Sequence, residues 1–322
     1  SGQDKLNLLE ESQRRGSLTL LTRNGASSYF IGPEGNAGPE YDIAEAFADY
    51  LGLSIRVKVA SEFSDLESLL KKRQGELIAA NLTRTRAREK LFSFGPDYAD
   101  VTTMVVYKRG KKRPREMADL LGMNVSVIAG SSYESLLENA RATLPDLKWT
   151  PAKSVGMEDL LLAIADGELD VTLVDSNIFK TSGQFYPRLR PGFTLEEQQH
   201  QAWAFLPGDD DSLVQKARSF FRLIKENGRL AEIQDRYNAN DTELDRVGMF
   251  QFMKQVRNRL PALIPIFQEV AEAYDLDWRL LAAMGYQESH WDADATSKTG
   301  VRGIMMLTRR TATQLGISDR LD

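Results

Sequence analysis

The 322-residue sequence contains no cysteine and only two histidines, His200 and His290. The absence of cysteine excludes disulfide bonds and thiolate metal sites, and it leaves the redox compartment open. The shortage of histidine disfavours a zinc site, so we expect no metal and no cofactor. No apolar stretch approaches the roughly 20 residues needed to span a bilayer. The formal net charge of -5 gives no general attraction to nucleic acid, so we expect no nucleic-acid partner.

The composition is that of an ordinary globular protein, with 42% hydrophobic and 27% charged residues. A chain of 322 residues suits two domains better than one. Ser1 and Gly2 look like a cloning scar, so we expect that a signal peptide or membrane anchor has been removed. Residues 1–16 are predicted to be an N-terminal extension.

Short strands alternate with helices from Leu18 to about Tyr237. Asp42 is predicted to be the N-cap of a helix that ends at Gly52. The predicted strands are Leu18–Thr22, Ile55–Val59, Leu77–Ala80, Val125–Ile128 and Val171–Val174. This alternation predicts parallel sheets with helical crossovers.

Four groups of residues follow one another along the chain in the same order as in a known protein family. They are Tyr41–Phe47; Asn81–Arg86 with Phe92–Phe94 and Pro96–Tyr98; Gly130–Ser132; and Asp166–Val171 with Asp175. In this order they resemble the periplasmic amino-acid-binding proteins of ABC transporters. The resemblance implies an α/β two-lobed periplasmic-binding-protein-like domain, which we assign to residues 17–240 as a regulatory domain.

The resemblance also implies a ligand site. Arg86 matches the arginine that clamps the ligand carboxylate, a task that suits a planar guanidinium. Asp175 matches the acid that receives the ligand ammonium. The other predicted ligand-binding residues are Thr83, Ser131, Ser132 and Tyr29. Together they imply a muropeptide or an amino-acid-like ligand with a free amino-acid end.

A dense basic run extends from Lys108 to Arg115. Anionic lipid or polymer could contact it. Glycine and proline interrupt the run and no amphipathic face is present, so we predict a solvated loop near the crossover between the lobes.

Beyond a predicted linker at residues 241–250, the periodicity is purely helical. Pro261 suits the first turn of a helix, and Asp277 is predicted to cap a second one. Leu281, Met284 and Glu288 lie along one side of that second helix. We expect burial of Glu288 there to disfavour its charged form, as a proton donor requires.

Tyr286–Trp291 and Gly300–Leu307 resemble the Glu-Ser and Gly-Leu-Met-Gln motifs of the lytic transglycosylases, which cleave peptidoglycan glycan strands. The resemblance implies that Glu288 is catalytic. The implied substrate-binding residues are Ser289, Gly303, Ile304, Met305 and Met306. Met306 stands where the family often has glutamine. We expect residues 251–322 to form an all-α lysozyme-like domain that is truncated and has little activity by itself.

The two resemblances together imply a ligand-regulated lytic transglycosylase in the periplasm, attached peripherally to the outer membrane. Trp291 could either stack on a sugar ring or pack in the core, and the sequence favours neither. A rival interpretation is an amino-acid receptor whose C-terminal helices are a non-catalytic appendage. A third is a hydrolytic lysozyme, which would leave a reducing end instead of an anhydro sugar.

Overall fold

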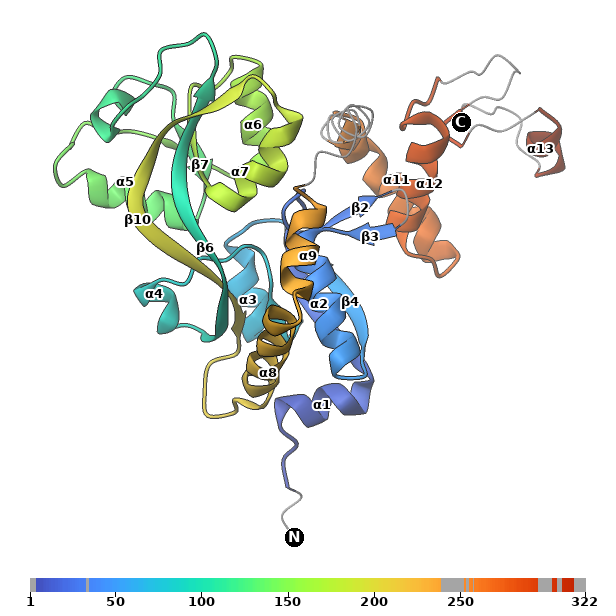
Figure 1. The fold of residues 1–322 in the computed structure, drawn as a ribbon. Helices are drawn as coiled ribbons and strands as arrows, with labels where there is room; N and C mark the ends of the chain where they lie inside the picture. The colour runs from blue at the N-terminus through green and yellow to red at the C-terminus, as the bar shows by residue number, and fades with distance from the viewer. Residues whose placement is uncertain are drawn as a thin grey trace. The chain divides into compact units, whose positions relative to one another are not determined.

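The computed structural model describes residues 4–32, 35–238, 252, 255–256, 258–294, 303–305 and 309–315 (Figure 1). The chain divides into two compact units. The N-terminal unit holds residues 1–30 and 38–240, and the C-terminal unit holds residues 31–37 and 241–322. The predicted linker, residues 241–250, lies outside the described residues.

The first lobe of the N-terminal unit is built around β1, which pairs in parallel with β4 on one side and β5 on the other. Its core contains Leu21, Leu70 and Ile78, all fully buried. The elements of this lobe are α1 (Leu8–Arg15), β1 (Ser17–Thr22), α2 (Pro39–Tyr50), β4 (Ser54–Val59), α3 (Asp65–Lys71), β5 (Leu77–Ile78), α4 (Arg86–Glu89), α8 (Ser212–Glu226) and α9 (Arg229–Arg236).

Two long strands, β6 (Ser93–Lys108) and β10 (Leu189–Phe205), pair antiparallel and run from the first lobe into the second (Figure 1). They complete a six-stranded sheet in the order β4-β1-β5-β10-β6-β9. The predicted parallel pairing holds for β1 with β4 and β5. The sequence analysis assigned no strand to residues 93–108 or 189–205, so it missed the antiparallel pairing of β6 with β10 and with β9.

The second lobe has its own core, which includes Val127, Leu137 and Leu173. Strands β7 and β8 pair in parallel, and β9 pairs antiparallel with β6. The elements of this lobe are η1 (Met117–Leu120), β7 (Ser126–Ile128), α5 (Ser132–Ala140), β8 (Thr150–Ala152), α6 (Met157–Ala165), β9 (Thr172–Asp175), α7 (Ser176–Ser182) and η2 (Gly183–Phe185).

Most strands lie where the sequence predicts them, but the first long helix does not begin at Asp42. Helix α2 begins at Pro39, because proline has a backbone angle suited to a first turn. Gly38, at φ 119°, provides the turn into the helix, and a Cβ there would meet the Ser28 carbonyl oxygen at 2.3 Å.

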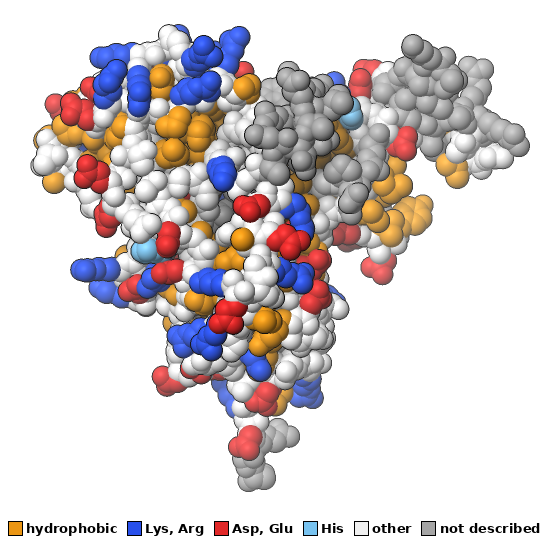
Figure 2. All heavy atoms as spheres, viewed as in Figure 1, with side chains coloured by type: hydrophobic (Ala, Val, Ile, Leu, Met, Phe, Trp, Pro, Cys, Tyr) orange, Lys and Arg blue, Asp and Glu red, His pale blue; other side chains and the backbone are white. Residues whose placement is uncertain are grey.

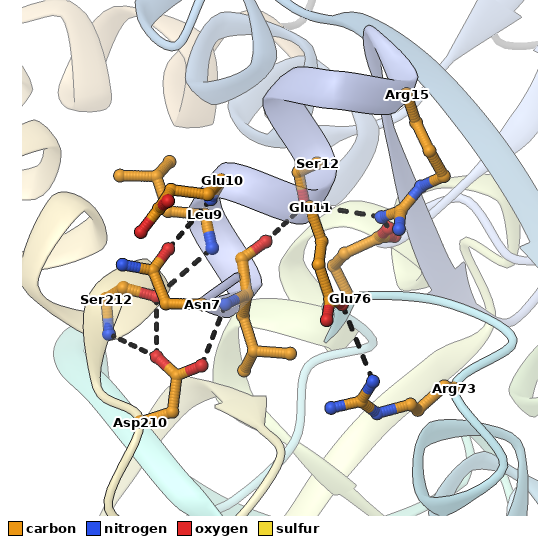
Figure 3. Close-up of polar contacts among 11 residues, drawn as sticks. Asn7, Leu9, Glu10, Glu11, Ser12, Arg15, Arg73, Glu76, Asp210 and Ser212 are labelled. Atoms are coloured by element: carbon orange, nitrogen blue, oxygen red, sulfur yellow. Dashed lines mark hydrogen bonds and ion pairs between the residues drawn. The ribbon is translucent and has the colours of Figure 1, made fainter. Parts of the chain in front are cut away.

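Helix α1 shows how residues 4–16 are held (Figure 3). The Leu8 N–H donates to Asp210 Oδ2 at 2.7 Å, and the Leu9 N–H donates to Ser212 Oγ at 3.1 Å. Arg15 pairs with Glu76 at the other end of the helix. Residues 8–15 of the predicted extension therefore form a helix that is fastened to the first lobe at both ends.

The C-terminal unit contains α11 (Leu260–Ala273), α12 (Trp278–Ser289) and α13 (Arg309–Gln314). A two-stranded sheet of β2 (Phe30–Gly32) and β3 (Gly35–Ala37) contributes residues 31–37 to this unit. Pro261 lies in the first turn of α11, and the Asp277 carboxylate accepts the Arg279 N–H at 3.0 Å, as predicted. Phe267, Ala282 and Trp291 are the buried centre of its core.

In the described ranges, no helix is long and apolar enough to cross a membrane. The same residues contain no group of three or more His, Asp or Glu side chains that could hold a metal ion.

Glu40 is a buried carboxyl in the first lobe that gives a testable pH dependence. It is 1% exposed, and burial raises its pKa to about 7. The folded protein therefore holds a proton that the unfolded chain releases above about pH 4.5. We predict that the free energy of unfolding falls by about 3 kcal/mol between pH 4.5 and 7 through Glu40 alone.

Urea unfolding at several pH values measures this slope. Glu40→Gln should make this slope shallower, whereas Glu226→Gln, at an exposed position on α8, should leave it unchanged. An identical slope in the wild type and in Glu40→Gln would contradict the assignment.

Candidate functional site

A cavity lies between the two lobes of the N-terminal unit. Thr83 and Arg88 reach it from the first lobe. Ser131, Ser132 and Asp175 reach it from the second. Four of the six predicted ligand-binding residues therefore come together. The cavity encloses about 80 Å³, which is room for roughly five to eight water molecules.

Of the two arginines on α4, Arg88 lines this cavity and Arg86 does not. Thr85 caps α4 by accepting the Arg88 N–H at 3.2 Å. Helical residues two positions apart point to opposite sides, so Arg86 is exposed while Arg88 turns inward. Arg88 Nη1 donates to the Thr83 carbonyl at 2.8 Å, and its guanidinium lies 5.4 Å from the centre of the Phe63 ring. Burial lowers the pKa of Arg88 to about 10, so it remains a cation at neutral pH.

Ser131 and Ser132 lie at the N-terminus of α5. Ser131 Oγ donates to the Ile128 carbonyl at 2.6 Å, so its hydroxyl proton is used within the turn. Ser132 is the first residue of α5, and N–H groups at this position have no partner inside a helix. A helix start facing a cavity suits an anion such as a carboxylate.

Asp175 ends β9 and is 2% exposed. Gln201 Nε2 donates to Asp175 Oδ2 at 2.8 Å, and the Asp175 N–H donates to the Tyr133 hydroxyl at 2.9 Å. Burial raises the pKa of Asp175 to about 6, and side-chain hydrogen bonds of its carboxyl with Gln201, Tyr133 and Thr103 oppose part of that rise. The group is therefore an anion at neutral pH and loses its charge in mild acid.

This pKa predicts that an amino-acid ligand binds more weakly in acid. Below about pH 6, protonation of Asp175 removes the negative charge that its ammonium requires. We expect affinity to fall by up to about tenfold for each pH unit below that value. Isothermal titration with a panel of L-amino acids from pH 7.5 to 4.5 measures it. Asp175→Asn should bind the ligand weakly at every pH. If the affinity of that variant fell in acid as much as that of the wild type, the assignment would be contradicted.

Two further charged residues line the cavity, and the sequence analysis missed both. Glu158 Oε1 accepts the Ala26 N–H at 2.8 Å, and burial raises its pKa. Arg23 donates to the Ala60 carbonyl at 2.9 Å and to the Val155 carbonyl at 2.7 Å. Arg23 directly follows β1, and ligands often bind beyond the carboxyl ends of parallel strands, so this position carried a signal. Glu158 had no comparable signal.

Tyr29 is not among the residues that line the cavity. It is 1% exposed and packs with its ring centre 5.8 Å from that of Tyr41. Ser27 and Ser28, directly before it, line the cavity instead. Tyr29 therefore supports the wall from behind.

Glu288 lies in the last turn of α12 with its side chain exposed. The predicted burial is wrong for the described residues. Helix α12 turns Ala282 toward the core and leaves Met284 45% exposed, so the Met284–Glu288 side faces water. Trp291 is 4% exposed and its Nε1 donates to the Ala282 carbonyl at 2.6 Å, which favours packing over sugar stacking.

The turn that contains Gly303, Ile304 and Met305 packs near the end of α12. A Cβ on Gly285 would meet Ile304 Cγ2 at 3.0 Å, so glycine allows this close approach. Gly285 lies three residues before Glu288, about one helical turn away. Ser289 Oγ donates to the Gly285 carbonyl at 3.1 Å. Met306 lies outside the described residues.

Comparison with known families resolves the class of the N-terminal unit. The model of bacterial extracellular solute-binding proteins, family 3, matches residues 22–240, more than half of the chain. The chain belongs to this family. A second model, the transglycosylase SLT domain, matches residues 265–322 of this solute-binding family member. The two matches confirm the predicted pair of modules and their order.

Curated relatives match almost the whole of this chain. A protein named membrane-bound lytic murein transglycosylase F from Stutzerimonas stutzeri is 40% identical over 320 residues, which cover 99% of this chain and 66% of that protein. A protein of the same name from Hahella chejuensis is 35% identical, with 98% and 62% covered. The chain thus spans just under two thirds of the length of these relatives.

Solved structures resemble the N-terminal unit. The holo arginine-binding protein of T. maritima has a TM-score of 0.61 at 21% identity, covering 67% of this chain and 93% of that one. The ancestral amino acid-binding protein AncCDT-1 has a TM-score of 0.64 at 18% identity, covering 73% and 100%. At these identities the likeness shows the two-lobed fold alone.

Proposed function

We propose that the chain joins a ligand-binding regulatory domain to the catalytic region of a peptidoglycan lytic transglycosylase. The observation that carries the proposal is the SLT-domain match, which contains the Glu288–Ser289 pair at the end of α12. The names of the curated relatives support the same activity.

Glu288 would act twice in this reaction. As an acid it would protonate the glycosidic oxygen between N-acetylmuramic acid and N-acetylglucosamine. As a carboxylate it would then take the proton from the muramyl C6 hydroxyl, whose oxygen attacks C1 and closes a 1,6-anhydro ring. One carboxylate serves both steps and no water is consumed, so the carboxylate pair of ordinary glycosidases is not required.

The exposure of Glu288 changes one part of this argument. The described residues do not remove its carboxyl from water. Desolvation must therefore come from the bound glycan strand or from residues outside the described set. The 303–305 turn would line the groove on one side, because it packs at Gly285.

Product analysis tests the activity. Peptidoglycan treated with the protein at its natural length should release 1,6-anhydro muropeptides, which mass spectrometry separates from reducing-end products. Reducing-end products alone would favour the hydrolytic lysozyme.

The proposed regulatory ligand has a free amino-acid end, as a peptidoglycan-derived peptide does. Arg88 and the start of α5 would hold its carboxylate, and Asp175 would hold its ammonium. A cavity of about 80 Å³ would receive this amino-acid end, and the rest of a longer ligand would extend beyond it.

Hydrogen bonds across the cavity describe a closed pair of lobes. Arg23 reaches from the first lobe to the Val155 carbonyl, and Ser154 Oγ donates to Glu62 Oε1 at 2.6 Å. At the end of α9, Gln184 Nε2 from the second lobe donates to the Tyr237 carbonyl at 2.9 Å. Opening the lobes would break this last bond close to where the chain leaves the N-terminal unit, which gives a route for regulation.

We predict that free muropeptide changes the glycan-release rate of the natural-length protein. The physical condition is that the ligand binds one lobe arrangement more tightly than another. Release of anhydro products is measured with and without the muropeptide, and an Arg88→Met variant should lose the response while keeping the basal rate. Equal rates with and without ligand in the wild type would remove the regulatory proposal.

The proposed location is the periplasm, with peripheral attachment to the outer membrane. The word "membrane-bound" in the names of the relatives supports attachment to a membrane.

A further inference from the structure

Two neighbouring segments at the far end of the second lobe concentrate positive charge. Strand β6 ends and β10 begins at the paired residues Lys108 and Leu189, and the Arg109 N–H donates to the Arg188 carbonyl at 2.7 Å. This pairing brings eight cations to one edge, which we call the basic patch: Lys108, Arg109, Lys111, Lys112, Arg113, Arg115, Arg188 and Arg190. Figure 2 shows Lys and Arg side chains gathered at this end of the N-terminal unit.

Few carboxylates offset this charge. Residues 108–119 contain six cations and two carboxylates, Glu116 and Asp119, and Arg188 and Arg190 raise the local balance to +6. The whole chain has a formal charge of -5, so the rest of it carries -11. Among the described residues, none of the eight cations lies within 4.0 Å of a carboxylate oxygen.

The backbone that presents the basic patch is held in place. Arg113 Nε donates to the Gly192 carbonyl at 2.8 Å. Pro114 is buried against Gly192, where a Cβ would meet Pro114 Cγ at 2.7 Å. The cations at Lys111, Lys112 and Arg188 are exposed on this fixed support. Charges that converge before binding lose less conformational freedom when a partner arrives.

We propose that the basic patch docks on the surface of an anionic phospholipid membrane. Eight exposed or half-exposed cations suit an extended layer of phosphates. Clusters of about four to eight Lys and Arg residues are typical of surfaces that bind anionic lipid headgroups. This step rests on the proposed membrane attachment and names the surface that makes it. Folded β6–β10 loops present the charge here, without insertion of an apolar segment.

Vesicle sedimentation tests the proposal with the 322-residue chain. The chain should sediment with phosphatidylcholine vesicles that contain phosphatidylglycerol, but not with phosphatidylcholine alone. Binding should weaken strongly as salt rises from 50 to 200 mM, because screening shortens the reach of these charges. The triple variant Lys111→Glu/Lys112→Glu/Arg188→Glu should bind at least about 100-fold more weakly, at roughly fivefold per lost cation.

A matched variant controls for net charge. Lys216→Glu/Arg218→Glu/Arg222→Glu changes the charge by the same amount at exposed positions on α8 and should bind like the wild type. An equal loss of vesicle binding in both triple variants would show that net charge, and not the basic patch, determines binding. If the triple variant of the basic patch binds vesicles as tightly as the wild type, the basic patch is not the docking surface, although the protein still attaches to membranes. No binding of this chain to phosphatidylglycerol vesicles would overturn the patch proposal, whereas attachment of the natural-length protein would then be tested separately. Patch-dependent binding to purified peptidoglycan in place of the vesicles would overturn it too and assign the surface to a polymer.

Discussion

Replacing Glu288 with glutamine is expected to abolish the release of 1,6-anhydro muropeptides by the natural-length protein. Glutamine keeps the size and polarity of the side chain but cannot give or take the proton. General acid–base catalysis contributes roughly 100- to 10,000-fold to rate, and Glu288 would serve in both proton transfers. The fall should therefore appear in kcat, with peptidoglycan binding retained.

The matched control is Glu269→Gln, which removes a carboxylate at an exposed position on α11. It should release products at the wild-type rate. Unchanged release in Glu288→Gln would contradict the enzymatic proposal and favour the rival interpretation, an amino-acid receptor with a helical appendage. The cavity with its carboxylate and ammonium partners would then be the whole functional site.

Local sequence signals predicted the elements well where the chemistry of one residue determines the local backbone structure. Pro261 and Asp277 begin helices because each residue satisfies a geometric need of a first turn. The buried strand at Leu77–Ile78 follows from its apolar run. The antiparallel pairing of β6 with β10 could not be predicted in this way, because partners about 100 residues apart leave no local trace.

The same limit explains the candidate sites. The motif order placed Thr83, Ser131, Ser132 and Asp175 in one cavity. It did not show that Arg88 lines this cavity while Arg86 does not, because the packing of α4 decides which of its sides faces the cavity. Likewise, Leu281, Met284 and Glu288 do share one side of α12, yet spacing along a helix does not say whether that side faces the core. Exposure of Met284 and Glu288 depends on what packs against the helix, which is tertiary information.

The charges of the cavity have a consequence for its ligand. Arg23 and Arg88 supply two cations, and Glu158 and Asp175 supply two carboxylates. Arg23 uses its guanidinium to join the lobes through backbone carbonyls, whereas in the described part of the chain Arg88 donates to one carbonyl, that of Thr83. Arg88 therefore has more donors left for a ligand carboxylate, since a guanidinium carries five N–H groups.

Arg88→Met should consequently weaken ligand binding far more than Arg86→Met. Loss of one partner from a buried ion pair costs about 2–5 kcal/mol, so we expect at least a roughly 30-fold loss of affinity for any ligand with a free carboxylate. Arg86 is exposed on the opposite side of α4, so its replacement should change affinity less than about twofold. Isothermal titration with free muropeptides and L-amino acids measures both.

Two further variants separate a binding role for Arg88 from a structural one. Arg88→Lys keeps the charge but not the planar pair of donors, so it should recover only part of the affinity. An amidated ligand, which lacks the carboxylate, should bind wild type and Arg88→Met alike. A large loss in Arg86→Met with none in Arg88→Met would show that the motif match located the clamp correctly and that the closed cavity is not the ligand-bound arrangement. The two variants therefore decide which side of the short helix α4 contacts the ligand.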